Sequence, residues 1–375
     1  MRFLFYTHSL VSDWNHGNAH FLRGVMKALQ ALGHETLALE PENAWSRANL
    51  VADQGEAALR RFAADFPTLR SQRYGSSFDH EAALASADVV LVHEWTDPGL
   101  VARIGRARAA GDFTLYFHDT HHRAVSAEGE IAGLELQHYD GVLAFGETLR
   151  QRYLKAGWGR QVHTWQEAAD DTLFRPQPGV APEGDLIWIG NWGDDERTAE
   201  IERFLIEPVG SLGLRATVRG VRYPQQALEA LAAAGIRYGG WIANAEVPRA
   251  FARHRVTVHI PRRPYVQTLP GIPTIRVFEA LACGIPLVSA PWEDREELFR
   301  PGEDYLLARD GEEMRAQLRR LLNEPELAAR VAASGLERIA ASHTCRHRAE
   351  ELLGILAAGG TARVRRQLSL REVAA

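Results

Sequence analysis

The chain has 375 residues, of which 46% are apolar and 24% are charged, and its formal net charge is −5 at pH 7. This length exceeds what one ordinary hydrophobic core organises, so two domains are expected, and the composition is typical of a water-soluble globular protein. The net charge gives no reason to expect nucleic acid as a partner, and the apolar runs are far too short to span a bilayer.

Two features of the sequence bear on the compartment in which the protein works. The first residues, MRFLFYTHSL, lack the charged start and the long apolar core of a signal peptide. The two cysteines, Cys283 and Cys345, are far apart, which favours a reducing compartment without structural disulfides. We therefore expect a cytoplasmic protein.

The first part of the chain alternates between apolar strand patterns and amphipathic helix patterns. Strands are expected over residues 1–8, 34–40, 87–94, 113–119 and 139–146, and helices over 20–33, 55–66, 100–111 and 147–157. A strand, a helix and a second strand in this order form the right-handed crossover unit of a parallel sheet. The pattern predicts one α/β domain over residues 1–165.

A second alternating set follows a segment without regular periodicity. Residues 166–184 are rich in Pro, Gly and Asp and are predicted to be a linker. Strands are then expected over 186–191, 214–220, 236–241, 256–261, 286–289 and 304–310, with helices between them, which predicts an α/β domain over 185–340. The remaining residues, 341–375, are expected to form a helix that returns toward the first domain and a frayed tail.

The two sets predict an α/β fold of two doubly wound parallel-sheet domains in tandem. Such sheets bind ligands outside the carboxyl ends of their strands, and two facing sheets form a cleft. The candidate functional residues are therefore those that follow a strand directly or begin the next helix.

The segment PGIPTIRVFEALACG, residues 270–284, places charged residues inside an apolar stretch. Its Gly/Pro loop runs into a helix start, with Thr274 as the expected capping residue. Backbone N–H groups at a helix start favour a diphosphate, which the forked cation of Arg276 would also bind. The carboxylate of Glu279, one turn further, suits the two hydroxyls of a ribose. The alternative is an i,i+3 ion pair on a solvated helix face.

The same segment resembles the nucleotide-sugar signature of the retaining, family-4-type glycosyltransferases, which have the GT-B fold of two Rossmann-like domains. In that family a Glu followed by Ala-x-Ala-x-Gly-x-Pro binds the donor ribose, and here this residue is Glu279. The segment EAADDTLFRP resembles a second signature, with Asp171, Phe174 and Pro176 matching. The stretches GNWGDDER, VRG and TIRVFEALACG are most similar to the spore-maturation, CgeB-like branch.

The resemblance implies a donor site for a nucleotide-diphosphate sugar in the second domain. Its expected residues are Glu279, Arg276, Thr274, Ile275, Gly271, Gly190, Asn191, Arg219, Trp241 and Arg262. The family usually has a further Glu eight positions before the ribose Glu, where this chain has Gly271. The family's diphosphate-binding lysine is also missing, so an arginine is expected instead: Arg197 by sequence position or Arg219 by strand-end position. Solvated surface is the alternative for each arginine, and hydrophobic core for Trp241.

Two segments of the first domain are candidates for the acceptor side. The loop SDWNHGNAHFLRG contains His16, Gly17 and Asn18, and the resemblance implies that its backbone approaches a ligand. The alternative is a helix start capped by an asparagine. The stretch YFHDTHHR follows a strand, so His118 and Asp119 are expected at a ligand-facing edge and, by resemblance, near the donor sugar. One alternative for this stretch is a structural role in which its histidines bond to the backbone. A zinc site in these histidine-rich segments is a further alternative, although the spacing matches no established motif.

The resemblance implies an enzyme that transfers a glycosyl group from a nucleotide-diphosphate sugar to an acceptor hydroxyl, with retention, without metal and without a further cofactor. His118 and Asp119 would be the catalytic residues. A glycan, a lipid-linked or a small-molecule acceptor is expected, as in polysaccharide or glycoconjugate biosynthesis. Residues 59–75 and 149–160 interleave arginine with aromatics and fit either solvated helices or peripheral contact with the inner face of a membrane. The alternatives are a catalytically degenerate nucleotide-sugar-binding protein and a nucleotide-sugar epimerase on the same fold.

Overall fold

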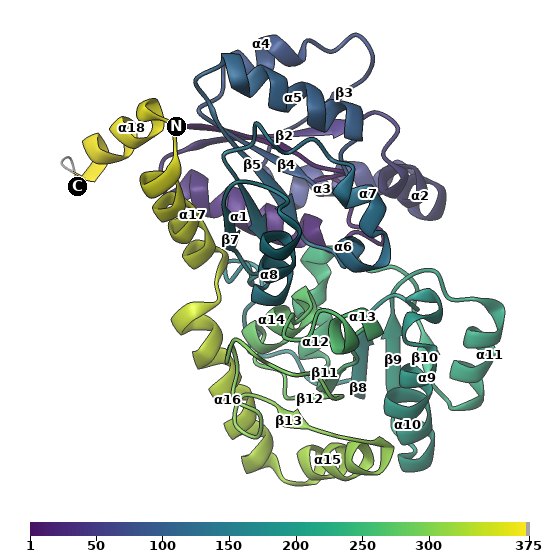
Figure 1. The fold of residues 1–375 in the computed structure, drawn as a ribbon. Helices are drawn as coiled ribbons and strands as arrows, with labels where there is room; N and C mark the ends of the chain where they lie inside the picture. Colours follow the sequence, from purple (N-terminus) through teal and green to yellow (C-terminus); the bar gives the residue numbers. More distant parts are fainter. Residues whose placement is uncertain (373–375) are drawn as a thin grey trace. The chain divides into compact units, whose positions relative to one another are not determined.

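Two parallel sheets organise the structure, a computed structural model that describes residues 1–372 (Figure 1). Each sheet belongs to one α/β unit. The first unit consists of Met1–Glu167 together with the chain from Cys345 onward, and the second of Ala168–Thr344. The predicted fold class of two parallel-sheet α/β domains is confirmed.

The first unit has a seven-stranded parallel sheet in the order β3-β2-β1-β4-β5-β6-β7. Its strands are β1 (Arg2–Tyr6), β2 (Glu35–Pro41), β3 (Ser71–Tyr74), β4 (Val89–His93), β5 (Thr114–Asp119), β6 (Gly141–Ala144) and β7 (Val162–Thr164). In β1, Phe3 lies opposite Thr36 of β2 and Val89 of β4. Strands β4 and β5 are buried along their whole length, because helices cover both faces of such a sheet.

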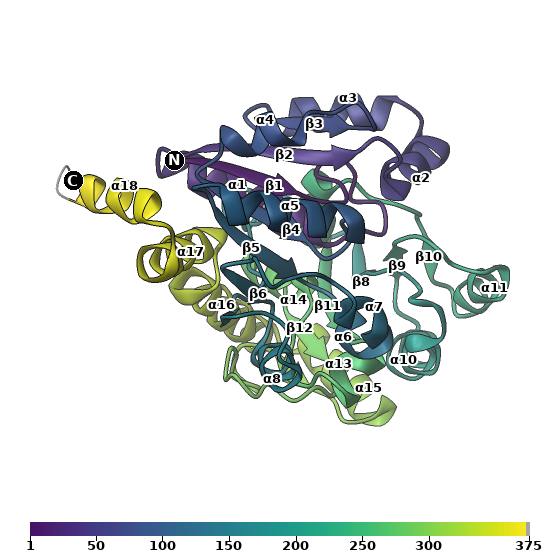
Figure 2. The same ribbon diagram turned by 45° about the horizontal axis from the view of Figure 1, so that its top comes forward.

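The helices of the first unit come from both ends of the chain. They are α1 (Asn18–Ala31), α2 (Trp45–Gln54), α3 (Ala57–Asp65), α4 (His80–Ala85), α5 (Pro98–Ala110), α6 (Arg123–Ser126), α7 (Glu128–Ala132), α8 (Glu147–Ala156), α17 (Cys345–Gly359) and α18 (Ala362–Glu372). Helix α17 packs against α1, as both views show (Figures 1 and 2). The tail, which was expected to be frayed, forms α18, and residues 373–375 lie outside the described residues.

The second unit has a six-stranded parallel sheet in the order β10-β9-β8-β11-β12-β13. Its strands are β8 (Gly184–Ile189), β9 (Ala216–Arg219), β10 (Arg237–Tyr238), β11 (His254–His259), β12 (Leu287–Ser289) and β13 (Leu306–Leu307). Its helices are α9 (Thr198–Ile201), α10 (Glu207–Leu212), α11 (Gln225–Ala233), α12 (Val247–Ala252), α13 (Arg263–Gln267), α14 (Ile275–Ala282), α15 (Gly311–Asn323) and α16 (Pro325–Ser342). The short turns η1 (Asp194–Glu196), η2 (Glu202–Ile206) and η3 (Asn244–Glu246) complete it.

Several short elements differ from the expected pattern. Strands β3 and β7 are edge strands of four and three residues, too short and too polar for an alternating pattern to show. Helices α2, α4, α6 and α7 occupy stretches for which no helix was expected. The single helix expected over 197–209 is instead α9, the π-helical turn η2 and α10 in succession.

The segment expected to be a separate linker, 166–184, joins the second unit from Ala168 onward. Ala169 and Phe174 are buried and pack in the same hydrophobic cluster as Phe278 and Leu281 of α14. Proline and glycine indicated an irregular backbone here, but they carry no signal of its burial.

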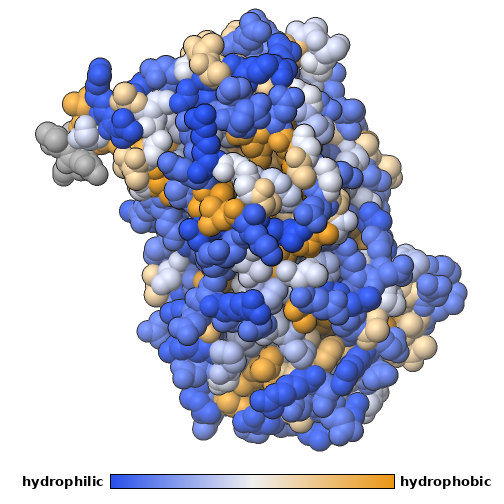
Figure 3. Space-filling model, viewed as in Figure 1, coloured by the Kyte–Doolittle hydropathy of each residue, from blue (hydrophilic) through white to orange (hydrophobic). Residues whose placement is uncertain are grey.

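The strands of each unit are parallel, so their carboxyl ends lie on one side of the sheet, and candidate residues gather there. We call this side the carboxyl edge, or simply the edge, of the sheet. His93 of β4 lies opposite His118 of β5 in the first sheet. In the second sheet, Arg219 ends β9 and His259 ends β11. Hydrophilic side chains cover most of the face seen in Figure 3. Within residues 1–372, no helix has the length and apolar character needed to cross a membrane.

Candidate functional site

The charged pair on α14 is the centre of the candidate site in the second unit. Arg276 Nη1 forms an ion pair with Glu279 Oε2, and Asn244 Nδ2 donates to Glu279 Oε1 at 3.5 Å. The Glu279 side chain is only 1% exposed, whereas that of Arg276 is 28% exposed. A carboxylate at this depth needs polar and charged partners, because an unpaired buried charge is costly. The i,i+3 pair therefore exists, but it does not lie on a solvated helix face.

The start of α14 has no capping hydrogen bond from the side chain of its N-cap residue. Thr274 is that residue, as expected, and its backbone is extended. Ile275, the first helical residue, is buried, and Arg276 follows it in the first turn. The first N–H groups of a helix and its dipole favour negative charge, so this start and Arg276 together can hold a diphosphate.

Gly271, in the loop before α14, is explained by its backbone. Its φ angle is +100°, and a Cβ atom there would lie 3.3 Å from Cβ of Arg295. Residues with side chains rarely adopt such a φ, so glycine is the residue that this loop conformation favours. A glutamate at this position, as in the resembling family, would be strained in this loop conformation.

Gly190 and Asn191 join the loops that follow the neighbouring strands β8 and β9. Asn191 Oδ1 accepts a hydrogen bond from Val221 N at 3.0 Å, and Tyr223 Oη donates to Gly190 O at 2.8 Å. These bonds connect the loop after β8 with the loop after β9 and fix the backbone of both.

Arg197, expected by sequence position to replace the family's lysine, lies inside the second unit. Its Nη1 donates to Ile260 O at 3.0 Å, its Nη2 donates to Asn191 O, and the guanidinium lies over the Trp188 ring at 5.2 Å. Burial, together with the charge of Arg262, lowers its pKa to about 9. Arg197 therefore ties the ends of β8 and β11 together.

The other basic and aromatic candidates of the second unit lie at or shortly after the carboxyl ends of its strands. Arg262 Nη1 forms an ion pair with Glu196 Oε2 at 2.8 Å. Arg219 donates to the carbonyl of Gly239, and burial lowers its pKa. Trp241 is half-buried, so it is not a core residue.

His259 is a polar group at this edge that the sequence analysis did not select. Its Nδ1 is hydrogen-bonded to Ser289 Oγ at 2.9 Å, and its Nε2 is buried without a hydrogen-bond partner. Burial and the charge of Arg197 lower its pKa to about 3, which keeps the ring neutral. Its place at a strand end is the signal that would have found it.

His118, at the carboxyl end of β5, is the centre of the candidate site in the first unit. Its ring lies 4.9 Å from that of Trp165 and 6.0 Å from that of Phe21. Burial lowers its pKa to about 3, so the imidazole is neutral. Its Nε2 atom is buried and has no hydrogen-bond partner. A neutral imidazole with one unused nitrogen is suited to a substrate hydroxyl.

Asp119 differs from His118 because both of its oxygens have partners within the fold. Tyr153 Oη donates to Oδ2 at 2.7 Å, and His121 N donates to Oδ1 at 3.0 Å. Burial raises the pKa of Asp119 to about 6. These contacts give Asp119 a positioning role at the strand end.

Four histidines stand in a row along this edge, which we call the histidine row: His8, His16, His93 and His118. Successive ring centroids are 5.3, 5.9 and 5.8 Å apart. Burial lowers the pKa of each of them. Sequence analysis selected His16 and His118; His8 and His93 join them because parallel strands end side by side.

The row is a set of neutral hydrogen-bonding groups. Besides His118 Nε2, His16 Nε2 and His93 Nδ1 are buried without hydrogen-bond partners. Among residues 1–372, no group of three His, Cys, Asp or Glu side chains is arranged to hold a metal ion, so the zinc alternative gains no support.

The loop before α1 contributes backbone and amide groups beside this row. Gly17 is the N-cap residue of α1, and Asn18 is the first residue of the helix. Asn18 is 6% exposed, and both of its side-chain amide atoms are buried without partners. A buried primary amide without partners is costly, so Asn18 stays a candidate for contact with a ligand.

Glu94, next to His93, is a carboxyl group that the sequence analysis missed. Arg123 Nη1 donates to Glu94 O at 2.7 Å and lies 3.3 Å from its Oε2. Burial and the nearby Asp119 raise the pKa of Glu94 well above its ordinary value. Its partners lie on the neighbouring strand and on α6, so no local motif reveals the cluster.

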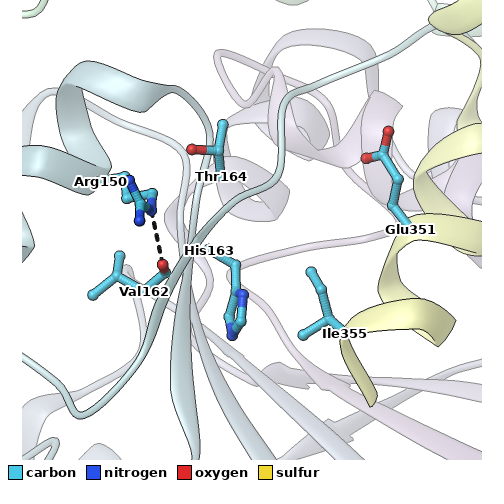
Figure 4. Close-up of a pocket in the computed structure, with 6 residues that line it drawn as sticks. All are labelled: Arg150, Val162, His163, Thr164, Glu351 and Ile355. Atoms are coloured by element: carbon cyan, nitrogen blue, oxygen red, sulfur yellow. Dashed lines mark hydrogen bonds between the residues drawn. The ribbon is translucent and has the colours of Figure 1, made fainter. Parts of the chain in front are cut away.

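A separate hollow of about 430 Å³ lies elsewhere in the first unit (Figure 4). It is lined by Arg150, Val162, His163, Thr164, Glu351 and Ile355. Arg150 Nε donates to Val162 O at 3.0 Å on one side of it, and Glu351 and Ile355 project from α17 on the other. No candidate site residue is among its lining residues.

Comparison with protein families and curated proteins gives one match. A family model described as "Glycosyl transferase-like" matches residues 197–354, which include α14 and its charged pair. No curated protein matches the sequence.

Solved structures of similar fold cover nearly the whole chain. Sucrose-phosphate synthase from Thermosynechococcus elongatus is 15% identical, with a TM-score of 0.66 over 99% of this chain and 100% of that one. Anabaena HepE in complex with UDP-glucose is 13% identical, with a TM-score of 0.68 over 96% and 100%. T4 phage β-glucosyltransferase in complex with UDP-glucose is 11% identical, with a TM-score of 0.62 over 96% and 99%. The chain therefore has the GT-B fold, with two parallel-sheet α/β units.

Proposed function

We propose that the protein is a glycosyltransferase that moves a sugar from a nucleotide-diphosphate donor to an acceptor hydroxyl. The observation that carries this proposal is the buried Glu279 beside Arg276 at the uncapped start of α14. The family match over residues 197–354 supports it. Structures of the same fold in complex with UDP-glucose make a UDP-sugar the first donor to test.

The proposed donor lies with its diphosphate at the start of α14 and its ribose against Glu279. The helix start and Arg276 meet the charge of the diphosphate, and the Glu279 carboxylate accepts hydrogen bonds from the ribose hydroxyls. The resemblance to the spore-maturation branch stays a prediction. The proposal names no particular sugar, because Gly271 stands where the resembling family has a donor-side carboxylate.

The proposed transfer retains configuration and uses no metal. The bond from the anomeric carbon to the leaving diphosphate breaks while the acceptor oxygen bonds to that carbon on the same face. The acceptor proton passes to the leaving phosphate oxygen, and the nucleoside diphosphate is released. Fixed positive charge at the leaving group then matters more than a strong side-chain base. Arg276 and the helix start supply that charge.

On the first unit, we assign the substrate-contacting role to His118. Its free Nε2 can bond to a sugar or acceptor hydroxyl. His16, Gly17 and Asn18 are proposed to form the rest of the contact surface. Asp119 is proposed to hold the strand end, because its oxygens are already bonded. We further propose that the acceptor is a glycan, a lipid-linked molecule or a small molecule. The proposal also includes a cytoplasmic location, with contact at the inner face of a membrane through residues 59–75 or 149–160.

A degenerate nucleotide-sugar-binding protein and an epimerase are the competing functions. Thermal-shift measurements with UDP, GDP, ADP and their glucose conjugates test the donor proposal, because a ligand that binds the folded state raises the melting temperature. We expect UDP and UDP-glucose to raise it; no shift with any of them would count against a donor site. Transfer or donor hydrolysis above background excludes the degenerate protein, and sugar conversion without any acceptor would instead favour the epimerase.

A further inference from the structure

Trp95 is an exposed tryptophan just beyond the carboxyl end of β4 in the first sheet, beside the candidate site. It follows the last residue of β4, His93, by two positions, and His93 lies opposite His118 in the sheet. Thr96 N donates to His93 O at 2.9 Å, so a tight turn fixes the backbone on both sides of Trp95. Even so, 39% of this tryptophan is exposed.

The indole is held in place by a network of charged groups. The guanidinium of Arg123 lies over the Trp95 ring at 4.3 Å, and the ring of His121 lies 5.6 Å away at an angle of 67°. Arg123 in turn donates to Glu94 O at 2.7 Å and to Glu130 Oε2 at 2.5 Å. Little side-chain freedom is left to lose when a ligand covers the ring, which favours binding.

Other exposed apolar side chains lack this arrangement. Leu154 on α8 is 44% exposed, but its aliphatic side chain has no ring face that a guanidinium could hold in place. Single exposed apolar residues are ordinary on protein surfaces. Trp95 stands out because a charged network fixes its ring and because it is two residues from the histidine row.

We propose that Trp95 is a stacking platform for a pyranose ring of the acceptor, so the acceptor is a carbohydrate. This inference rests on the proposed glycosyltransferase function. The face of a pyranose presents C–H groups that pack on the negative face of an aromatic ring, while its rim presents hydroxyls. Arg123 covers one face of the indole and His121 packs near it, so the exposed remainder of Trp95 offers a single apolar surface with polar neighbours, which matches that pattern. A lipid chain would instead need a continuous apolar surface.

The test uses the full chain saturated with UDP and four trisaccharide probes: maltotriose, cellotriose, laminaritriose and mannotriose. Saturation-transfer NMR detects weak binding and reports which ring protons approach the protein. We expect at least one probe to bind the wild type through its ring C–H protons. Trp95→Ala should weaken that binding roughly three- to tenfold, the range typical of an aromatic contact.

Two matched variants keep the inference falsifiable. Trp95→Phe keeps an aromatic face and should retain most of the binding. Leu154→Ala removes an apolar side chain of similar exposure, 44% against 39%, and should bind as the wild type does. Equal loss in Trp95→Phe and Trp95→Ala, or no loss in either, would overturn the platform.

The UDP-induced thermal shift, measured on the same samples, separates this inference from the proposed function. If UDP stabilises the wild type but none of the four probes binds, the carbohydrate platform is overturned and the donor site stands. If UDP fails to stabilise the wild type, the proposed function fails first.

Discussion

Arg276 and Glu279 form an ion pair in which only the cation reaches solvent, with side-chain exposures of 28% and 1%. Exposed ion pairs contribute little to stability, but removing one partner of a buried pair leaves an uncompensated charge. The carboxylate is therefore held in place before a ligand arrives, by Arg276 and by the amide of Asn244. The hydroxyls of a donor ribose would therefore meet a Glu279 carboxylate that is already oriented to accept their hydrogen bonds.

Glu279→Gln should weaken nucleotide binding while the chain still folds, because the side chain of Arg276, which loses its ion-pair partner, is 28% exposed and can be solvated. The amide keeps the shape of the side chain but loses the charged hydrogen bonds to a diol, which are worth about 1.5–3 kcal/mol, or roughly ten-fold or more in affinity. Titration calorimetry with UDP measures the change.

The matched control is Glu293→Gln. Glu293 forms an ion pair with Arg295 at 2.9 Å, but its side chain is 62% exposed, so its substitution should leave UDP affinity unchanged. Equal UDP affinity in wild type and Glu279→Gln would remove Glu279 from the donor site.

Gly271→Ala should destabilise the second unit more than Gly302→Ala does. Both glycines have a positive φ, +100° and +90°, which costs about 1–2 kcal/mol for a residue with a side chain. A Cβ at Gly271 also approaches Arg295 Cβ at 3.3 Å, whereas nothing lies within 4 Å of a Cβ at Gly302. Urea midpoints measure the difference, and equal midpoints for the two variants would show that the contact with Arg295 relaxes without cost.

Periodicity predicted the long elements of this fold because they bury one consistent face. The helix expected over 20–33 is α1, and the continuous apolar run at 87–94 is β4. Edge strands such as β7 have three residues and one neighbour, so they leave no pattern to find. In the expected linker, Phe174 is buried because it packs against α14. That contact depends on the folded structure rather than on local composition.

The candidate sites show the same division between local and long-range information. Glu279 lies in a contiguous motif, and His118 follows from the rule that parallel strands end at a ligand-facing edge. The bond from Asn244 to Glu279 and the contact of Arg123 with Glu94 join residues 35 and 29 positions apart. Such contacts exist only once the strands are paired, so a single sequence does not reveal them.

Transfer should continue after divalent metals are removed. In the proposed mechanism the charge of the leaving diphosphate is met by Arg276 and the start of α14, which chelation does not affect. Activity with a UDP-sugar is compared before and after EDTA treatment. Loss of activity with EDTA that manganese restores would overturn the metal-independent mechanism.

The buried His118 should make the protein less stable as the pH falls. Burial lowers its pKa from 6.5 to about 3, so between these values the unfolded chain binds a proton that the folded chain does not. The stability contribution is therefore complete above pH 6.5 and is lost as the pH falls toward 3. The loss approaches about 1.4 kcal/mol per pH unit for one proton.

The measurement is the pH dependence of urea unfolding in wild type and His118→Gln. The variant lacks this titrating group, so its free energy of unfolding should fall less steeply between pH 6 and pH 4, by about 1.4 kcal/mol per pH unit. The slope is compared rather than the absolute stability, because His118→Gln also changes packing against Trp165. Parallel slopes in the two proteins would show that His118 titrates normally in the folded state.

His118→Ala should lower turnover much more than nucleotide affinity. The nucleotide-binding residues belong to the second unit and His118 to the first, so UDP binding should be retained. Loss of one positioned hydrogen-bonding group at developing charge costs on the order of a hundred-fold in rate. A purely structural role predicts instead a lower melting temperature and residual activity in proportion to the folded fraction. Measuring UDP affinity, melting temperature and turnover on one preparation separates the two, and a variant that melts early but turns over normally per folded molecule would remove His118 from the site.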